Sequence, residues 1–316
     1  MSQQDLFHRL VWVPLQREPA MEPAMTDTLA AFDQHRPRLY GIAYRMLGSR
    51  ADAEDMVQEA YLRWHHSDVE RVLTPEAWLV TIITRLCIDR LRAAKTEREA
   101  YVGPWLPDPL INYTAPPADA SAELASDLSV AFLLILERLA PEERAAFLLH
   151  DVFDNEYADI ARILGKNETA CRQIVHRARE RVRRDRPRFK VSEAARTRLL
   201  ERFLTALHEQ NTDALLALFA SDATWTSDGG GKAKAALKTM HGAKLVSRFI
   251  SGIWRRYLSE LTYRLVMING QTGLVGFADG RAVWALAIET DGSRILAAYA
   301  LVNPDKLAGI SSERAS

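Results

Sequence analysis

The side chains with the clearest chemical use are basic ones spaced along residues 156–186, EYADIARILGKNETACRQIVHRARERVRRDR. Gly165 is a residue type that ends a helix, and Asn167 is one that caps the next. Apolar residues recur in that second helix at helical spacing and predict its buried face, namely Cys171, Ile174, Val175, Ala178 and Val182. From residue 166 to residue 190, ten Lys or Arg residues accompany three acidic ones, a net charge of plus seven.

This basic helix-turn-helix predicts binding to duplex DNA, because a helix fits the major groove and its cations neutralise phosphates. Arg172, Gln173 and His176 lie near the start of the second helix and are expected to reach base edges. Arg177 and Arg179 follow and are expected to contact the phosphate backbone. The alternative is a charged, solvated helix end, which the adjoining helix and the glycine turn make less favoured.

Covalent chemistry has weaker support in this sequence. Asp222, Asp228, Tyr263 and Asp279 are the candidates for moving a proton next to a carbonyl group. Asp228 and Asp279 precede glycines, however, and turn formation explains them without chemistry. No metal-ligand spacing or nucleophile motif stands out, so we predict no enzyme activity, no metal and no cofactor. Tryptophans in this part of the chain fit either an ordinary core or a pocket for a small apolar ligand.

The elements around these residues divide the chain into segments. Helical spacing runs from Leu29 to about Arg98 and again from about Ser121 to Arg184. Residues 101–120 between them hold five prolines and a glycine, which predicts an extended linker. A third segment opens with two helices and ends in four strands, residues 261–268, 274–278, 281–289 and 294–302. Asx-Gly pairs between these strands predict tight hairpins, so this segment is α+β with an antiparallel meander.

Composition supports a globular protein of several domains. The chain has 316 residues, of which 48% are hydrophobic, with 41 basic and 41 acidic residues. The balanced charge excludes a uniformly basic nucleic-acid coat but permits separate patches of opposite sign. Two cysteines fit a reducing cytosol, and no apolar run is long enough for a membrane span. Residues 1–25 are expected to be unstructured, with either Met21 or Met25 as a possible start.

The first helical segment carries a family resemblance. LYGIAYRMLGSRADAEDMVQEAYLRWH and then PEAWLVTIITRLCIDRLRAAK resemble region 2 of sigma-70-type transcription initiation factors, and the helix-turn-helix resembles their region 4. The resemblance spans about residues 28 to 186 and looks like the extracytoplasmic-function group, which lacks regions 1 and 3. It implies that an acidic helix binds core RNA polymerase through Asp52, Asp55, Gln58 and Glu59. It also implies that the next helix binds the downstream promoter box (−10) through Arg85, Arg90, Arg92 and Lys95.

One residue departs from the family pattern. Where relatives commonly carry Asn in the −10-binding helix, this chain has Arg85, so the resemblance implies no base preference at that position. Trp64 and Trp78 lie on apolar faces of their helices, where core packing is favoured over base stacking.

The C-terminal segment, about residues 194–308, resembles a SnoaL-like domain, a cone formed by helices against a curved sheet. Two short motifs resemble the signature of a subgroup in which such a domain is fused and acts in cis. These motifs comprise Trp105, Leu106, Pro107, Asp108 and Pro109 in the linker, and Asp228, Gly229, Gly230, Gly231 and Lys232 in a loop. Residues 303–306 belong to the same pattern. We expect the two motifs to contact each other and to fix the spacing of the helical domains; an exposed, flexible loop is the alternative.

The predicted fold is therefore multidomain, with two all-α helical domains and an α+β SnoaL-like domain. The expected boundaries are 26–100 for region 2, 101–120 for the linker, 121–190 for region 4 and 192–310 for the SnoaL-like domain. The expected function is a cytoplasmic sigma factor that binds core RNA polymerase and −35 and −10 promoter DNA, with regulation in cis. A one-component helix-turn-helix regulator with a ligand-binding or enzymatic C-terminal domain is the alternative.

Overall fold

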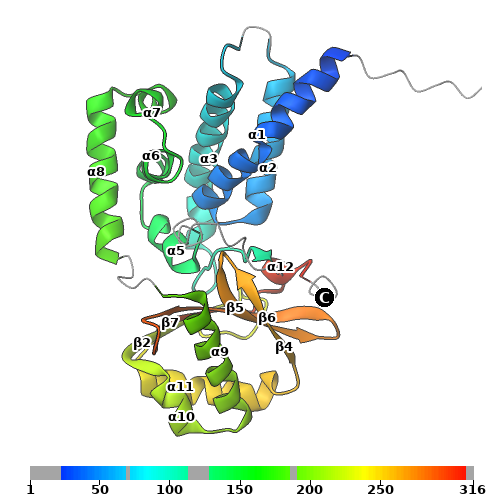
Figure 1. The fold of residues 1–316 in the computed structure, drawn as a ribbon, viewed down its shortest axis with the longest axis vertical. Helices are drawn as coiled ribbons and strands as arrows, with labels where there is room; N and C mark the ends of the chain where they lie inside the picture. The colour runs from blue at the N-terminus through cyan, green and yellow to red at the C-terminus, as the bar shows by residue number, and fades with distance from the viewer. Residues whose placement is uncertain (1–22, 69–71, 113–127, 186–190, 311–316) are drawn as a thin grey trace, which may run out of the picture.

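The computed structural model of this protein describes residues 23–68, 72–112, 128–185 and 191–310 (Figure 1). Its helical part contains seven helices within these residues: α1 (Pro23–Leu47), α2 (Arg50–His65), α3 (Pro75–Glu99), α5 (Val130–Glu137), α6 (Pro141–Asp151), α7 (Tyr157–Leu164) and α8 (Glu168–Asp185). The N-terminal segment expected to be unstructured lies outside the described residues up to residue 22. The expected helical start near Ser121 also lies outside them.

Local sequence explains where these helices begin and end. Gly48 ends α1 at φ +66°, and the Ser49 hydroxyl accepts a hydrogen bond from the backbone N–H of Asp52 at the start of α2. Gly165 ends α7 at φ +65°, and the Asn167 side chain accepts from the N–H of Ala170 at 2.8 Å. Thr74 precedes α3, whose first residue is Pro75, and its side chain makes no capping hydrogen bond to the residues that the structure describes. The fixed φ of proline at the first helical position favours the helix start without one.

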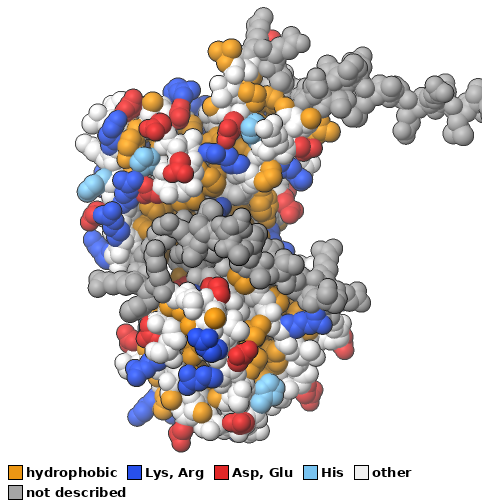
Figure 2. All heavy atoms as spheres, in the orientation of Figure 1, with side chains coloured by type: hydrophobic (Ala, Val, Ile, Leu, Met, Phe, Trp, Pro, Cys, Tyr) orange, Lys and Arg blue, Asp and Glu red, His pale blue; other side chains and the backbone are white. Residues whose placement is uncertain are grey.

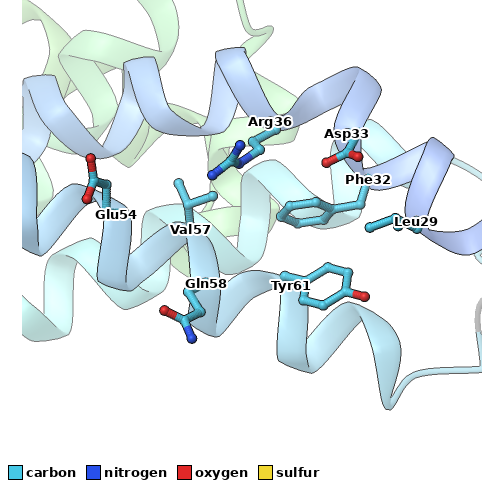
Figure 3. Close-up of a pocket in the computed structure, with 8 residues that line it drawn as sticks. All are labelled: Leu29, Phe32, Asp33, Arg36, Glu54, Val57, Gln58 and Tyr61. Atoms are coloured by element: carbon cyan, nitrogen blue, oxygen red, sulfur yellow. The ribbon is translucent and has the colours of Figure 1, made fainter.

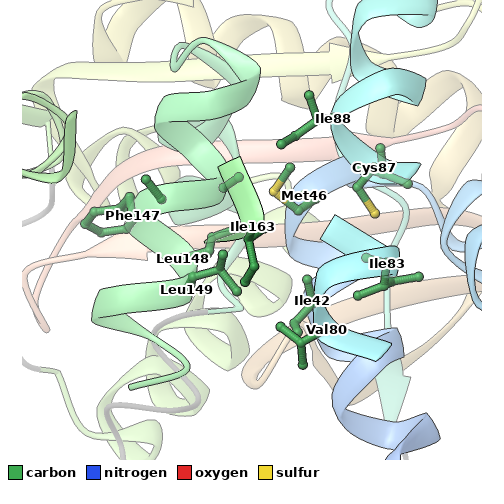
Figure 4. Close-up of a cluster of buried hydrophobic side chains, with 14 of the residues drawn as sticks. Ile42, Met46, Val80, Ile83, Cys87, Ile88, Phe147, Leu148, Leu149 and Ile163 are labelled. Carbon is green, nitrogen blue, oxygen red and sulfur yellow. The ribbon is translucent and has the colours of Figure 1, made fainter. Parts of the chain in front are cut away.

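The two helical segments share one hydrophobic core. Figure 4 shows side chains of α1 and α3 facing side chains of α6 and α7 across that core. The residues concerned are Ile42, Met46, Val80, Ile83, Cys87 and Ile88 on one side, and Phe147, Leu148, Leu149 and Ile163 on the other. Periodicity predicted two helical domains joined by an extended linker, and it did not predict that they pack together. We call this packing of α1–α3 against α5–α8 the closed arrangement of the two helical segments.

The C-terminal part combines helices with one mixed sheet. Its helices are α9 (Glu193–His208), α10 (Thr212–Ala217), α11 (Ala243–Ile253), the π-helical turn η2 (Trp254–Leu258) and α12 (Pro304–Leu307). Its strands are β2 (Phe219–Asp228), β3 (Met240–His241), β4 (Thr262–Ile268), β5 (Gln271–Ala278), β6 (Arg281–Thr290) and β7 (Ile295–Leu301). The order in the described sheet is β1-β4-β5-β6-β7-β2-β3, where β1 (Ile111–Asn112) comes from the linker. This architecture agrees with the predicted α+β class.

The predicted meander is present as antiparallel pairs from β4 to β7. Asn269-Gly270 and Asp279-Gly280 have positive φ at both residues, as the hairpin prediction requires. The prediction of an antiparallel meander was incomplete, because β2 pairs with β7 in parallel and makes the sheet mixed. The short strand β3 pairs with β2 at the edge of the sheet. Neither β2 nor α11 was predicted, since their apolar residues are mixed with small and charged ones.

The two faces of the sheet have different partners. Helices α9, α10 and α11 cover one face and bury a core that includes Phe203, Trp225, Trp254 and Trp284 (Figure 1). The other face points toward the helical part and buries Leu106 of the linker. The linker was predicted to be extended, and two of its residues, Ile111 and Asn112, also pair with the end of β4. The described linker residues are thus packed between the helices and the sheet.

No helix among the described residues has the length and apolar character needed to cross a bilayer.

Candidate nucleic-acid interface

Helix α8 presents most of the basic residues predicted to bind DNA. Its apolar face packs on α6, which leaves Arg172, Gln173, His176 and Arg177 exposed. Figure 2 shows Lys and Arg side chains along the edge of the molecule that α8 forms in Figure 1. Arg172 pairs with Glu168 at 2.8 Å, an exposed pair that DNA phosphates can replace at little cost. The predicted base-reading residues therefore lie together at the start of an accessible helix.

Arg179 has a different environment from the other predicted DNA contacts. Its Nε donates to both carboxylate oxygens of Asp151 in α6, at 3.0 and 2.8 Å. That hydrogen bonding raises the pKa of the Arg179 guanidinium. Arg181, two residues further along, pairs with Glu143 at 2.6 Å. These two arginines connect α8 to α6, a packing role that the charge count of the sequence did not reveal.

Two of the predicted −10-binding residues of α3, Arg85 and Arg92, contact the second helical segment although their side chains remain partly exposed. The Arg85 guanidinium donates to the carbonyl of Ile163 at 2.9 Å and to that of Arg162 at 3.1 Å, both at the end of α7. Arg92 pairs with Glu142 at the start of α6 at 2.8 Å. Lys166 pairs with the same carboxylate at 3.1 Å. We call these contacts between α3 and α6–α7 the closed interface.

The remaining two residues of the α3 set are separated from the closed interface. Arg90 is half-buried, and it pairs with Asp52 of α2 at 2.9 Å and with Glu97 at 2.8 Å. The hydrogen bond from Arg90 lowers the pKa of the Glu97 carboxyl. Lys95 is exposed. The structure thus brings Arg85 and Arg92 to one interface, and it places Arg90 in the packing of α2 on α3.

The predicted polymerase-binding residues lie on α2, and their accessibility differs. Asp52 is engaged by Arg90, and Glu59 pairs with Arg63 one turn away at 2.9 Å. Asp55 and Gln58 are exposed. Gln58 also lines a groove of about 360 Å³ between α1 and α2, shown in Figure 3. The groove has an apolar floor and a charged rim, formed by Leu29, Phe32, Asp33, Arg36, Glu54, Val57, Gln58 and Tyr61.

The loop and linker motifs meet at the carboxylate of Asp228, which has no solvent exposure. Its Oδ1 accepts a hydrogen bond from the Tyr101 hydroxyl at 2.6 Å. Its Oδ2 accepts from the backbone N–H of Leu106 at 2.9 Å and from Lys306 Nζ at 2.8 Å. Lys306 Nζ also donates to the carbonyl of Leu106, and burial lowers the pKa of this ammonium group. One buried ion pair therefore joins the linker, the end of β2 and α12.

Asp108 connects the same linker to the first helical segment. Its backbone N–H donates to the carbonyl of Gly48 at 2.8 Å, and its carbonyl accepts from the Tyr44 hydroxyl at 2.5 Å. Its carboxylate accepts from the backbone N–H of Arg50 at 2.8 Å. Burial raises the pKa of the Asp108 carboxyl. Asn269 of the β4–β5 hairpin donates to the Tyr44 hydroxyl at 2.6 Å, so α1, linker and sheet share one hydrogen-bond network.

The indole ring of Trp105 packs against two cations and against the backbone of a glycine. The guanidinium carbon of Arg98 lies 3.2 Å from the ring centroid, and Lys306 Nζ lies 4.3 Å from it. A Cβ on Gly48 would come within 2.6 Å of the ring, so only glycine fits against Trp105. Leu106, Pro107 and Pro109 are buried beside it. We call the contacts of linker residues 101–110 with α1–α3, Asp228, Asn269 and Lys306 the linker cluster.

The glycines of the loop motif allow its close approach, but Lys232 does not reach the linker. A Cβ on Gly230 would lie 2.2 Å from Asn303 Nδ2 and 2.9 Å from the Tyr101 hydroxyl. A Cβ on Gly231 would meet Val102 at 3.2 Å, and one on Gly229 would meet a carbonyl within the loop. Lys232 is exposed and pairs with Asp305 at 2.5 Å. The expected contact thus forms through Asp228 and the glycines, not through Lys232.

Sequence reasoning missed several residues of the linker cluster. Tyr44, Arg50, Tyr101 and Asn269 make contacts that depend on parts of the chain distant in sequence. The hairpin type did place Asn269 in a turn. Its buried position against the linker had no sequence signal, because turn formation alone explains an Asn before a Gly.

The candidates for proton transfer are not brought together. Asp222 and Asp279 are exposed, and Asp279 lies in a hairpin turn at φ +48°. Asp228 is buried in the linker cluster. The Tyr263 hydroxyl donates to the carbonyl of Leu258 at 2.7 Å. Over the parts of the chain that the structure describes, no group of three His, Cys, Asp or Glu side chains is placed to hold a metal ion.

Comparisons with known proteins cover the helical part in two segments. Residues 31–97 match the family described as Sigma-70 region 2, and residues 129–182 match the family described as Sigma-70, region 4. The ECF RNA polymerase sigma factor SigJ of Mycobacterium tuberculosis (strain H37Rv) is 36% identical over 292 residues, which are 89% of this chain and 93% of that protein. The probable ECF RNA polymerase sigma factor SigI of the same species (strain CDC 1551 / Oshkosh) is 30% identical over 90% of this chain and 96% of its own.

The similarity extends to three dimensions. The crystal structure of the Mycobacterium tuberculosis extracytoplasmic function sigma factor SigJ superimposes with a TM-score of 0.70 at 35% identity. It covers 89% of this chain and 98% of its own, so the match includes the C-terminal sheet domain as well as both helical segments.

Proposed function

This chain belongs to the extracytoplasmic-function group of sigma-70 family RNA polymerase sigma factors, as predicted, and from that premise we propose how its parts act. The free chain is a closed form in which two of the predicted −10-binding residues, Arg85 and Arg92, are bound by its own region 4. The C-terminal domain holds this form through the linker cluster, and binding to core polymerase opens it. Promoter DNA then engages α3 and α8.

The observation that carries this proposal is the environment of Arg85. Both hydrogen bonds of its guanidinium go to carbonyl groups at the end of α7. These donors become available to DNA only when α3 separates from α7, although the rest of the Arg85 side chain is exposed. The ion pair of Arg92 with Glu142 is exposed and adds a weaker contact across the same interface. Opening also exposes apolar side chains of the shared core, which opposes it in the free chain.

The C-terminal domain stabilises the closed form because its contacts depend on the placement of the linker. The linker follows α3 and precedes α5, so its position limits how far the two helical segments can separate. Asp228 and Lys306 are both buried. Asp228 accepts a hydrogen bond from the backbone N–H of Leu106 in the linker, and Lys306 donates one to the carbonyl of the same residue. Removing one member of a buried ion pair typically costs about 3–5 kcal/mol, since the other charge is left without a partner.

We propose that α2 provides the first contact with core polymerase. Asp55 and Gln58 are exposed in the closed form, so this contact requires no prior opening. Acidic residues on α2 would steer it toward a basic surface on polymerase. The start of α8, with Arg172, Gln173 and His176, would read the −35 box once the helical segments have the spacing of the promoter.

The proposal is tested by run-off transcription with increasing concentrations of chain at a fixed concentration of core polymerase. Asp228→Ala weakens the linker cluster, so we expect half-maximal transcription at a concentration at least about tenfold lower than for the unmodified chain. A truncation after Arg188 is expected to change in the same direction. Lys232→Ala is the matched control, because it removes a charge from the same loop outside the cluster.

Equal half-maximal concentrations for the unmodified chain, Asp228→Ala and the truncation would exclude a regulatory role for the C-terminal domain. Circular dichroism of Asp228→Ala must show the helix and strand content of the unmodified chain, so that a loss of folding is not read as a loss of regulation.

We further propose that the chain performs no covalent chemistry and acts where the chromosome is transcribed, in the cytoplasm. A small ligand in the C-terminal domain has limited room. A small cavity of about 90 Å³ lies beside Trp254 and Arg255. The indole N–H of Trp284 is buried and has no hydrogen-bond acceptor among the residues that the structure describes, which is the feature that favours a ligand. Such a ligand would have to displace the aromatic side chains around it.

A further inference from the structure

A second basic surface lies in the C-terminal domain, outside both helical segments. Residues 229–258 contain seven Lys or Arg residues and no Asp or Glu, although the whole chain has 41 of each sign. The seven are Lys232, Lys234, Lys238, Lys244, Arg248, Arg255 and Arg256. All are exposed. The balanced charge of the chain therefore conceals a strongly basic segment here.

Helix α11 and η2 arrange part of this segment as a stripe. Arg248 and Arg255 follow Lys244 by four and by eleven residues. These spacings place all three side chains on one face of the continuous helix. Eleven residues of helix extend about 16 Å. That length equals the rise of about five phosphates along one strand of duplex DNA.

The loop before β3 joins the same surface at Tyr257, whose side chain is 50% exposed. Lys234 Nζ lies 5.8 Å from the centroid of the Tyr257 ring, and the guanidinium carbon of Arg256 lies 5.6 Å from it. Two cations from different elements therefore meet at an exposed tyrosine. We call Lys234, Lys238, Lys244, Arg248, Arg255, Arg256 and Tyr257 the C-terminal basic surface.

The cations of this surface lack the internal partners found elsewhere. Lys232 pairs with Asp305, but the six others make no ion pair with any residue that the structure describes. In α8, by contrast, Arg172, Arg179 and Arg181 all pair with carboxylates. The surface thus presents more uncompensated charge than the helix that the family uses for the −35 box.

We propose that the C-terminal basic surface binds the phosphate backbone of duplex DNA, as a third contact without sequence preference. Lysine is depleted in protein–protein interfaces, whereas Lys, Arg and Tyr are common donors to phosphate. Six cations without carboxylates between them match a polyanion better than a protein surface of mixed charge. Four of its cations lie on α11 and η2, away from the closed interface, so they are accessible in the closed form as well.

The test measures binding of the full chain to a duplex of random sequence by fluorescence anisotropy at a series of salt concentrations. The variant Lys244→Ala/Arg248→Ala/Arg255→Ala removes three cations of the stripe. Each phosphate contact contributes about 0.9 to the slope of log K against log salt, so we expect the slope to fall by about 2.7. Affinity at low salt is expected to fall about tenfold or more.

The matched control is Arg198→Ala/Arg202→Ala/Arg281→Ala, which removes three exposed cations of the same domain outside the surface. We expect a much smaller change of slope for it. A stripe variant with the slope of the control overturns the proposal. So does a stripe variant that keeps its DNA affinity but loses affinity for core polymerase without DNA, because the surface is then a protein interface.

This inference does not depend on regulation by the linker cluster. Asp228→Ala can leave transcription unchanged while the stripe variant shows the expected smaller slope of log K against log salt. In that case the proposed regulation fails and the DNA contact stands.

Discussion

At the scale of single residues, burial decides what each charged group does. Asp55 and Asp228 are both acidic residues singled out by motif, but one is exposed on α2 and the other has no solvent exposure. The buried carboxylate is stabilised by three hydrogen bonds from the linker and α12. In the neighbouring Asp108, burial raises the pKa of the carboxyl by more than the hydrogen bond from Arg50 lowers it.

The raised pKa of Asp108 makes a prediction about pH. The folded state holds this proton more tightly than the unfolded state, whose aspartate pKa is about 3.9. The contribution of the Asp108 carboxyl to the free energy of unfolding is therefore greatest below the unfolded pKa. That contribution is lost as the pH rises through the folded pKa. Asp108→Asn keeps an oxygen for the N–H of Arg50 and cannot titrate in this range.

The measurement is urea unfolding of both chains at about pH 4 and at pH 7. We expect the stability of Asp108→Asn relative to the unmodified chain to be higher at pH 7 than at about pH 4. Each pH unit between the folded and unfolded pKa corresponds to about 1.4 kcal/mol of this difference. A relative stability that is the same at both pH values would contradict the prediction.

At the scale of elements, much of the fold followed from the sequence. The helix-turn-helix was predicted because Gly165 and Asn167 act locally, through a left-handed turn and a cap. The hairpins of β4 to β7 were predicted for the same reason. Strand β2 was missed because its parallel partner β7 follows about 70 residues later, and such pairing leaves no local pattern. The packing of Arg179 on Asp151 likewise depends on a neighbouring helix.

Two glycines with similar backbone angles provide a prediction at this scale. Gly165 has φ +65° and Gly230 has φ +57°, so alanine costs about 1–2 kcal/mol of backbone strain at either position. A Cβ at residue 165 meets no atom within 4 Å, whereas one at residue 230 collides with the Asn303 side chain. Overpacking adds about 1–3 kcal/mol at residue 230.

Chemical denaturation of the two variants checks this difference. Gly165→Ala is expected to lose about 1–2 kcal/mol of stability, and Gly230→Ala about 2–5 kcal/mol. Gly165→Ala serves as the control for strain alone. Equal losses for the two variants would mean that the loop moves away from Asn303 without cost.

At the scale of the whole molecule, the closed arrangement is the feature that sequence patterns did not contain. Helical spacing predicted helices in both segments, but periodicity does not say which partner covers the apolar face of a helix. The shared core joins residues such as Ile83 and Phe147, which come from segments that the linker separates. The candidate DNA-binding residues were identified by type and spacing, while the involvement of Arg85 and Arg92 in the closed interface was not.

Opening of the closed form is expected to be visible as a change in distance between α3 and α8. Thr96 and Arg184 are exposed on these helices, and cysteines introduced there can be labelled, since the native Cys87 and Cys171 are fully buried. We expect energy transfer between a donor and an acceptor at these positions to change when core polymerase is added. Asp228→Ala is expected to show part of this change without polymerase, and Lys232→Ala none.

Identical transfer in the free chain and in the complex with core polymerase would contradict an opening of the helical segments. It would also mean that Arg85 keeps its contacts with α7 during initiation.

The turn between α1 and α2 has a consequence for signalling within the chain. Gly48 in this turn fits against Trp105, and the first N–H of α2, that of Arg50, binds the carboxylate of Asp108 across 58 positions of sequence. A large protein that grips α2 and rotates it displaces Trp105 and Asp108 in the same movement. Because α2 is also where we propose that core polymerase binds first, we expect this single movement to carry the signal from the binding surface to the linker.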